Sequence, residues 1–248
     1  MPDYLLLQKD LLAPGIYRFR LEGNLGARPG QFVMVRAWPG FDPLLARPFS
    51  VHDQESSYFS LLFQVRGRGT KILSQKNEGE KISILGPLGT GFDLSQKGAA
   101  ILVAGGLGIA PFLFLAKELR KQKKDVFLFY GARTQKELLL LKEFEKLGVK
   151  LFLATEDGSR GHKGFVTEPL IRFLENNSQG AIYACGPLPM LKAVGELSRK
   201  FGLKSFVSLE AHMACGLGMC LGCVVPKKNQ GYLHVCIEGP VVPAEFVF

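Results

Sequence analysis

The chain is poor in cysteine and tryptophan, and it has no long uninterrupted apolar run. Of its 248 residues, five are cysteine and one is tryptophan. Its first residues, MPDYLLLQKD, lack the basic start and the apolar segment of a secretory signal, so we expect a cytoplasmic protein. Four cysteines lie within 22 residues near the C-terminus. In a chain without a secretory signal, such a group of cysteines predicts metal binding rather than disulfides.

Residues 98–116 contain no charged side chain, and a stretch of that length could cross a bilayer. Three glycines and Pro111 interrupt this stretch, however. We therefore predict a buried strand followed by a helix rather than a membrane span.

Acidic residues are outnumbered, since 22 Asp and Glu oppose 31 Lys and Arg, for a formal net charge of +9. A basic protein binds nucleic acid when its charge is clustered, and here the charge is mostly dispersed. The one dense patch predicts the solvated end of a helix, and it consists of Arg120, Lys121, Lys123 and Lys124. The sequence therefore argues against a nucleic-acid partner, whereas an acidic protein partner remains compatible with it.

Local patterns divide the chain into three segments. Residues 1–95 contain short β-forming runs separated by Gly and Pro, which is typical of a small antiparallel barrel. Residues 96–207 alternate strands with helices, which predicts an α/β domain with a parallel sheet. Residues 208–248, the cysteine segment, are too few and too rich in Gly and Cys to build a core, so an inorganic centre would stabilise them.

These patterns predict individual elements. In the first segment we expect strands at 31–37, 58–65 and 81–86, with Gly86-Pro87-Leu88-Gly89 as a turn leading out of the barrel. In the second segment we expect strands at 100–104, 125–130, 150–155, 181–185 and 205–209. The expected helices of that segment are 109–123, 135–147, 166–176 and 187–201.

The cysteines occur as Cys215-x4-Cys220-x2-Cys223, and twelve residues separate Cys223 from Cys236. A [2Fe–2S] cluster takes four thiolates, and three cysteines in nine residues with a distant fourth fit the plant-type ferredoxin loop. Structural zinc is the alternative, although zinc sites usually pair two short CxxC turns. The spacing therefore favours an iron–sulfur cluster.

The residues between the cysteines favour the same centre. Gly216, Gly218 and Gly222 allow the backbone to curl so that amide N–H groups point at the sulfurs. His212 and His234 flank the cluster, but four cysteines already complete the ligand set. We expect both histidines to be surface or packing residues.

A flavin site is predicted at Arg47-Pro48-Phe49-Ser50, which we place at the end of a strand. An Arg can neutralise a pyrophosphate, an aromatic ring can lie on a flavin or adenine, and a Ser hydroxyl can bond a ring nitrogen. Downstream, Gly67-Arg68-Gly69-Thr70 could bring backbone N–H groups to phosphate. An ordinary Gly-rich turn is the alternative for this second motif.

A nucleotide loop is predicted between the strand at 100–104 and the helix that follows it. There, Gly105, Gly106 and Gly108 would open a helix N-terminus to a phosphate. The loop is not a GxGxxG fingerprint, and Arg133, rather than an acidic residue, follows the next strand. Cys185 ends a later strand, where it either faces a nicotinamide or is a small buried residue.

The motifs RPFS, GRGT, GGLGIAP and CGP occur in the order typical of the ferredoxin–NADP reductase superfamily, which the chain resembles. The ending SLEAHMACGLGMCLGCVV is similar to that of one family within it, the electron-transfer subunits of dihydroorotate dehydrogenase B. The resemblance covers essentially the whole chain, and the cysteine pattern shows no departure from it.

The resemblance implies three cofactors: FAD in the barrel domain, NAD in the α/β domain and [2Fe–2S] in the C-terminal domain. The implied FAD contacts are Arg47, Pro48, Phe49, Ser50, Leu62, Phe63, Gln64, Gly69 and Thr70. The implied NAD contacts are Gly105, Gly106, Gly108 and Cys185. The implied cluster ligands are Cys215, Cys220, Cys223 and Cys236.

The resemblance also implies a partner, the FMN-containing catalytic subunit that oxidises dihydroorotate to orotate, in an α2β2 heterotetramer of pyrimidine biosynthesis. Electrons would pass from that FMN through the cluster and FAD to NAD⁺, so we assign no catalytic acid or base to this chain. The first alternative is a related subunit serving a hydrogenase, a sulfide dehydrogenase or a ferredoxin:NADP⁺ oxidoreductase. The second is a redox-sensing module without catalysis.

Overall fold

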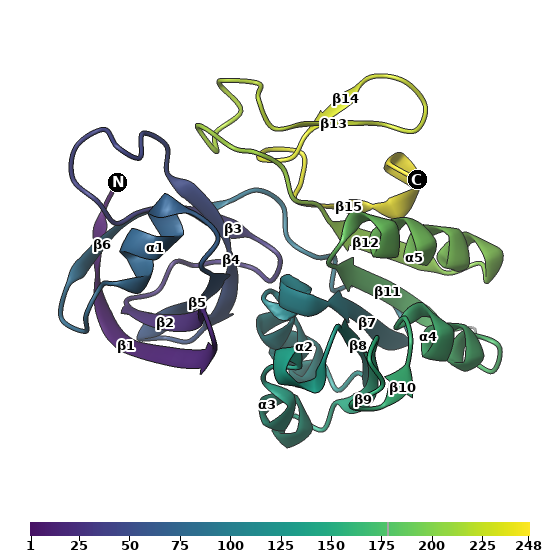
Figure 1. Cartoon of the computed structure of the whole chain (residues 1–248). Coiled ribbons are helices and arrows are strands. Elements are labelled where there is room, and N and C mark those ends of the chain that lie inside the picture. Colours follow the sequence, from purple (N-terminus) through teal and green to yellow (C-terminus); the bar gives the residue numbers. More distant parts are fainter. Residues whose placement is uncertain (178) are drawn as a thin grey trace.

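The computed structural model of the chain describes residues 1–177 and 179–248, which form a barrel, an α/β unit and a C-terminal segment packed on both (Figure 1). The barrel closes in the order β1-β2-β5-β4-β3-β6 with every pair antiparallel, which confirms the predicted barrel. Its strands are β1 (Asp3–Ala13), β2 (Ile16–Glu22), β3 (Phe32–Arg36), β4 (Arg47–Gln54), β5 (Tyr58–Gln64) and β6 (Lys81–Leu88).

Three details of the barrel differ from expectation. Arg47 to Ser50 begin β4 rather than ending a strand, with Pro48 as its second residue. The Gly67–Thr70 motif does not form a simple turn, because it opens the short helix α1 (Arg68–Ser74). Residues 86–88 continue β6 instead of turning away from it.

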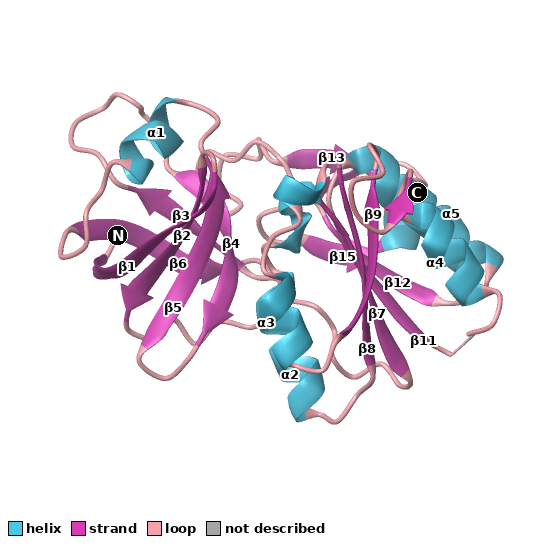
Figure 2. Ribbon diagram, turned by 60° about the horizontal axis from the view of Figure 1, so that its bottom comes forward, coloured by secondary structure: helices cyan, strands magenta, loops and turns pink. Residues whose placement is uncertain are grey.

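The α/β unit is a seven-stranded sheet in the order β10-β9-β8-β7-β11-β12-β15 (Figure 2). Its strands are β7 (Ala99–Gly105), β8 (Val126–Ala132), β9 (Lys150–Thr155), β10 (His162–Lys163), β11 (Gly180–Cys185), β12 (Lys204–Ser208) and β15 (Val241–Pro243). All neighbours are parallel except β12 and β15, so the predicted parallel sheet is confirmed for the second segment. The cysteine segment supplies β15, so it adds an edge strand to this sheet.

Each expected helix of the α/β unit is present in shorter form. The helices are α2 (Phe112–Lys121), α3 (Leu141–Lys146), α4 (Thr167–Leu174) and α5 (Leu188–Lys200). The expected helix at 109–123 begins later because the 3₁₀ turn η1 (Gly106–Ile109) precedes it. The expected helix at 135–147 is split into η2 (Gln135–Glu137) and α3, since Leu140 takes a left-handed φ of 62°.

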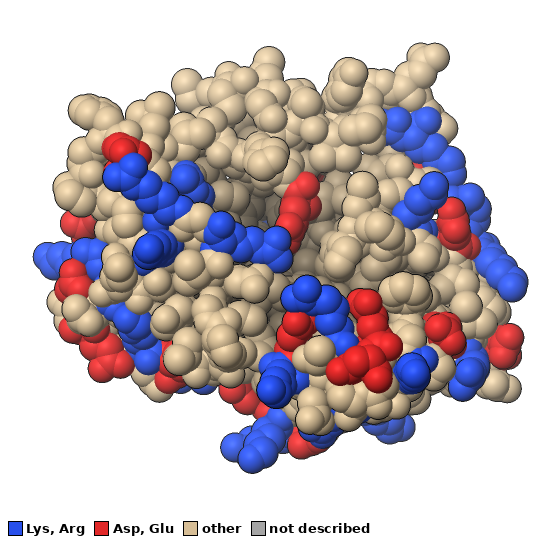
Figure 3. Space-filling model, in the orientation of Figure 1, with Lys and Arg blue, Asp and Glu red and all other residues tan. Residues whose placement is uncertain are grey.

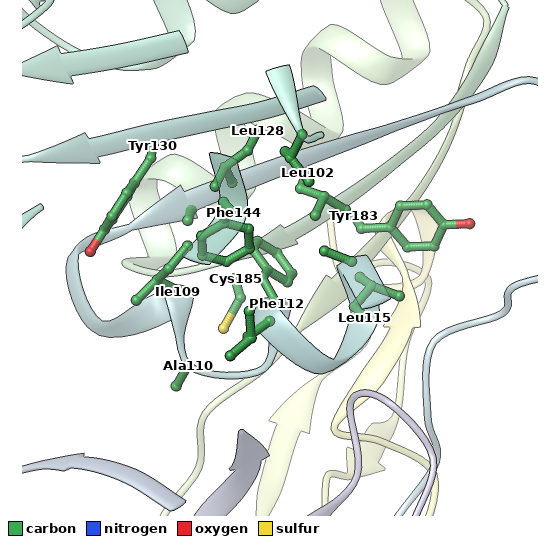
Figure 4. Close-up of a cluster of buried hydrophobic side chains, with 14 of the residues drawn as sticks. Leu102, Ile109, Ala110, Phe112, Leu115, Leu128, Tyr130, Phe144, Tyr183 and Cys185 are labelled. Atoms are coloured by element: carbon green, nitrogen blue, oxygen red, sulfur yellow. The ribbon is translucent and has the colours of Figure 1, made fainter. Parts of the chain in front are cut away.

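The strands are continuous apolar runs whose successive side chains point to opposite faces, so they build one core on each face of the sheet. Leu102 and Leu128 pack with Phe112 of α2 and Phe144 of α3 on one face (Figure 4). On the other face, the core is formed with residues of α4 and α5. The sheet is therefore buried from both sides, and the carboxyl ends of its strands are the exposed edge at which ligands bind in such folds.

The C-terminal segment has little regular structure besides β15. It contains the hairpin of β13 (Val224–Pro226) and β14 (Tyr232–His234), and it ends with η3 (Ala244–Phe246). Within the described ranges, no helix combines the length and the apolar character that crossing a membrane requires. Residues 98–116 form β7, η1 and part of α2.

An aromatic cluster on the sheet provides a test of the core. Phe129 is fully buried and stacks on Phe152 with ring centroids 4.5 Å apart. We expect Phe129→Ala to lower the free energy of unfolding by about 3–5 kcal/mol, because it leaves a cavity between packed rings. Phe165 is 67% exposed, so Phe165→Ala should change it by less than about 0.5 kcal/mol. Denaturant unfolding of both variants measures the difference, and equal losses would contradict this core.

Candidate cofactor and cluster sites

The two barrel motifs lie side by side. The guanidinium of Arg47 lies over the Trp38 ring, with 5.6 Å between its Cζ and the centroid. A Cβ added at Gly69 would lie 2.9 Å from the Trp38 ring and 3.2 Å from Arg47 Nε, so only glycine fits there. The RPFS strand and the N-terminus of α1 are thus joined through Trp38, a residue the sequence motifs do not contain.

The hydroxyl of Thr70 is already used within its own loop. It accepts hydrogen bonds from the backbone N–H groups of Arg66 and Gly67, at 2.9 and 3.0 Å, and donates to the Gly67 carbonyl. Thr70 therefore shapes the loop. What remains for an anion is the set of N–H groups in the first turn of α1, which have no partner inside a helix.

Two of the expected flavin contacts have buried side chains. Leu62 packs into the core shared with the α/β unit, and Phe63 lies in the barrel core, where its ring is 5.4 Å from that of Phe49. Any contact of Leu62 or Phe63 with a cofactor must therefore use the backbone. Gln64 is half-buried, and its side chain accepts a hydrogen bond from Arg66.

The nucleotide loop packs directly on the Cys185-Gly186-Pro187 turn. A Cβ at Gly108 would lie 2.1 Å from the Cys185 carbonyl oxygen, and one at Gly105 would lie 2.7 Å from Pro187. Gly106, in contrast, has a φ of 53° and open space around it. The first and third glycines allow close packing, which leaves the backbone at Gly106 open to a phosphate group.

Cys185 is a neutral residue of this turn. It is 5% exposed, and burial raises the pKa of its thiol to about 12, so the thiol stays protonated at neutral pH. At the end of β8, Arg133 forms an ion pair with Glu137, with Nη2 and Oε1 2.9 Å apart.

Backbone amides point at the cysteine sulfurs. Cys215 Sγ accepts N–H groups from Leu217 and Cys220 at 3.4 and 3.5 Å, and Cys236 Sγ accepts one from Gly218 at 3.1 Å. The Cys236 N–H in turn lies 3.4 Å from Cys223 Sγ. This arrangement fits anionic sulfur, and therefore fits the thiolate ligands of a cluster.

The environments of the four thiols differ. The amides of Leu217 and Cys220 lower the pKa of Cys215 to about 6, so it is a thiolate at neutral pH. Burial raises the pKa of Cys236 to about 11. Cys223 and Cys236 are buried, whereas Cys220 is exposed. In residues 1–177 and 179–248, no three His, Cys, Asp or Glu side chains gather tightly enough to hold one metal ion.

The glycines of the cysteine segment play different parts. Gly216 and Gly218 have φ values of 71° and 79°, as the curled loop requires. Gly222 does not have a positive φ, and it is Leu221 that takes one, at 56°. His234 forms a pair with Glu238, with Nδ1 and Oε2 3.4 Å apart.

The flavin motif and the cysteine segment face each other across a cavity of about 500 Å³. It is lined by Leu45, Ala46, Arg47 and Pro48 on the barrel side and by Ala211, His212, Met213, Ala214 and Gly222 on the other. Figure 3 shows a hollow between the barrel and the α/β unit, with basic side chains on its barrel side and below it and an acidic side chain within it.

Two family models match parts of the chain, and relatives match nearly all of it. Residues 210–248 match the iron–sulfur cluster binding domain of dihydroorotate dehydrogenase B, and residues 102–196 match an oxidoreductase NAD-binding domain. A dihydroorotate dehydrogenase B (NAD(+)) electron transfer subunit from Caldanaerobacter subterraneus is 43% identical over 98% of this chain and 96% of its own. One from Desulforamulus reducens is 38% identical over the same shares.

Solved structures show a similar fold. An NADH-dependent reduced ferredoxin–NADP oxidoreductase, described for flavin-based electron bifurcation, has a TM-score of 0.88 at 31% identity over 100% of this chain and 90% of its own. An Amycolatopsis cytochrome P450 reductase has a TM-score of 0.70 at 22% identity over 81% of this chain and 66% of its own.

The glycines of the cysteine segment provide a test of the cluster site. A Cβ at Gly216 would lie 2.6 Å from Met34 in a left-handed backbone, so we expect Gly216→Ala to lower the iron and labile sulfide content severalfold. A Cβ at Gly222 would meet no atom closer than 3.7 Å, so Gly222→Ala should keep both. Iron and sulfide analysis compares them, and an equal content in the two variants would count against the described loop.

Proposed function

The chain belongs to the family of dihydroorotate dehydrogenase B electron transfer subunits, and on that premise we propose how its residues serve electron transfer. Electrons from a partner that oxidises dihydroorotate pass to NAD⁺ by way of a [2Fe–2S] cluster and FAD. The observation that carries the proposal is the 500 Å³ cavity that lies between the flavin motif and the cysteine segment. The proposed one-electron site and the proposed flavin site are therefore neighbours, one on each side of this cavity.

The cluster ligands are Cys215, Cys220, Cys223 and Cys236. The amides aimed at Cys215 and Cys236 stabilise negative charge on the sulfurs, and this favours the thiolate form that binds iron. When bound, the cluster would carry one electron at a time and FAD one or two, so two electrons taken up singly, together with one proton from solvent, would form the hydride that NAD⁺ accepts.

The barrel binds FAD along the start of β4 and the first turn of α1. Arg47 neutralises the pyrophosphate, while Pro48, Phe49 and Ser50 border the flavin. Gly69 permits the close approach of backbone N–H groups, and Thr70 holds their loop in shape. Gln64 and the backbone of the preceding two residues lie along the ribityl chain.

The α/β unit binds NAD at the carboxyl edge of its sheet. Gly106 exposes the backbone at the start of η1 to the phosphates, and Gly105 and Gly108 seat the loop on the Cys185 turn. Cys185 contributes a small neutral surface beside the nicotinamide. The chain thereby orients both cofactors, and we assign no general acid or base to it.

The partner is an FMN-containing catalytic subunit, in an α2β2 heterotetramer. The relatives' names support the existence of such a partner, since they describe an electron transfer subunit. We place its docking surface on the cysteine segment from Met213 to Met219, because electron transfer requires the cluster to be near the interface. Three exposed apolar side chains of the cysteine segment support this placement, namely Leu217, Met219 and Leu221.

A second candidate is an NADH-dependent ferredoxin–NADP oxidoreductase subunit. The similarity to that solved structure, at 31% identity over the whole of this chain, favours it. Both candidates use the same cofactor sites, so the identity of the partner distinguishes them.

Reconstitution with a partner tests the pyrimidine assignment. Purified protein mixed with an FMN-containing dihydroorotate-oxidising subunit should reduce NAD⁺ in proportion to the dihydroorotate consumed. Absorbance at the NADH wavelength measures the rate, and each subunit alone is the control. If the mixture forms no NADH while a ferredoxin supports turnover with NADPH, the second candidate is correct.

A cysteine variant tests the relay. Cys220→Ser should lose iron and labile sulfide, and with them dihydroorotate-dependent NAD⁺ reduction, but it should keep NADH-dependent reduction of a dye through FAD. Cys185→Ser, which alters a cysteine outside the cluster, should keep its iron. Full coupled activity in Cys220→Ser would refute the relay.

A further inference from the structure

Strand β4 is irregular just after the flavin motif. Val51 pairs with Leu61 and Asp53 pairs with Ser60, so two steps along β4 match one step along β5. His52 is therefore the extra residue of a β-bulge. In a regular strand, neighbouring side chains point to opposite faces, whereas a bulge redirects them.

The bulge directs two consecutive side chains to the α/β unit. His52 contacts the residue after η1, and Asp53 forms an ion pair with Lys117 of α2, with Oδ2 and Nζ 2.7 Å apart. Val51, before them, lies in the barrel core. The start of β4 thus belongs to the flavin motif. The continuation of β4 bonds the end of the nucleotide loop, through His52, and helix α2, through Asp53.

The contact of His52 is a buried hydrogen bond. Its Nδ1 lies 2.6 Å from the carbonyl oxygen of Ala110, and the side chain has no exposed surface. Because a carbonyl only accepts, Nδ1 must carry the proton. Burial also lowers the pKa of His52, so the ring is neutral, with the charged groups Asp53, Arg18 and Glu143 around it.

Ala110, which accepts this hydrogen bond, lies at the end of the nucleotide loop. Ala110 follows η1 and comes two residues after Gly108, so its carbonyl belongs to the end of the nucleotide loop. His52 comes two residues after Ser50 of the flavin motif. One hydrogen bond therefore ties the flavin strand to the nucleotide loop.

Other polar contacts hold the two units together through residues outside the loop. Arg18 of β2 bonds Glu143 of α3, with Nη1 and Oε1 2.7 Å apart, and also bonds Asp10. Lys117 of α2, which pairs with Asp53, also forms an ion pair with Glu55. These pairs join the bodies of the two units, so they serve as controls for a general loss of interface stability.

We propose that His52 is a positioning residue that sets the nucleotide loop against the flavin strand and thereby aligns nicotinamide with flavin for hydride transfer. The inference rests on the proposed FAD and NAD sites. In the step concerned, NADH transfers a hydride to oxidised FAD, which leaves NAD⁺ and the reduced flavin anion. A small misplacement of the reacting atoms slows such a step steeply, because it depends on their distance and alignment.

Three substitutions separate this role from simple packing. His52→Leu fills the space but leaves the Ala110 carbonyl without a donor. His52→Asn retains a donor close to the position of Nδ1, whereas His52→Gln places its donor farther out, near the position of Nε2. The role therefore predicts rescue by Asn but not by Gln.

The test is anaerobic rapid mixing of the purified FAD- and cluster-loaded protein with NADH. Flavin bleaching gives the rate of reduction at saturating NADH, and the long-wavelength flavin–nicotinamide charge-transfer absorbance reports stacking. We expect His52→Leu and His52→Gln to lose about tenfold to hundredfold in rate and most of that absorbance. Flavin and iron content should stay at the wild-type level, and His52→Asn should recover at least half of the absorbance.

Hydrogen–deuterium exchange gives a second readout. In His52→Leu, amides of residues 105–112 should exchange faster than in the wild type, while those of β8 and β9 should not change. Glu143→Gln, which removes the ion pair with Arg18 but leaves the His52–Ala110 hydrogen bond in place, should lower the melting temperature but keep the charge-transfer absorbance.

Two outcomes would overturn the inference. One is a wild-type rate and wild-type absorbance in His52→Leu, and the other is an equal loss in the Asn, Gln and Leu variants with unchanged exchange of the loop. Failure of the proposed function would differ from both, because then NADH would not reduce the flavin of the wild-type protein either.

Discussion

The apolar contact between the barrel and helix α2 is the interaction on which every site of this protein depends. Phe114 of α2 is part of the barrel core, and Ile16 and Leu62 of the barrel are part of the core beneath the sheet. The two units therefore share their hydrophobic interiors rather than meeting across a wet surface. Because hydride transfer requires two cofactors in contact, this shared core provides the rigidity that separate, mobile domains would lack.

The cysteine segment depends on the same construction. It has no core of its own, yet β15 joins the sheet and Gly216 packs against Met34 of the barrel. Cys223 and Cys236 lie in the core on the other face of the sheet, together with Met34 of the barrel, whereas Cys220 is exposed. In the proposed assignment, one side of the cluster site borders the cavity beside the RPFS strand, and the exposed side at Cys220 is where a partner would approach. A centre in this position can take electrons from outside and deliver them inward.

Sequence patterns predicted the α/β unit well because buried parallel strands are continuous apolar runs, as in AAILVA before the nucleotide loop. They did not indicate β1, in which Lys9 and Asp10 interrupt the alternation, or α1, where glycines resembled a turn. They also did not indicate β15, since three residues are too few to form a pattern. The expected helix at 135–147 is split because Leu140 takes a left-handed φ, a conformation that a leucine in the sequence does not predict.

The sequence by itself determined the chemistry of this protein. Four cysteines at ferredoxin-like spacing, the RPFS motif and the glycine loop indicate which cofactors the chain can bind, because ligand type and spacing are properties of the chain. Only the tertiary structure decided which groups meet. The burial of Leu62 and Phe63, the role of Trp38, and the bond from His52 to Ala110 depend on contacts between distant segments. Local pattern carries no information about such contacts, because they are fixed by the packing of one unit against another.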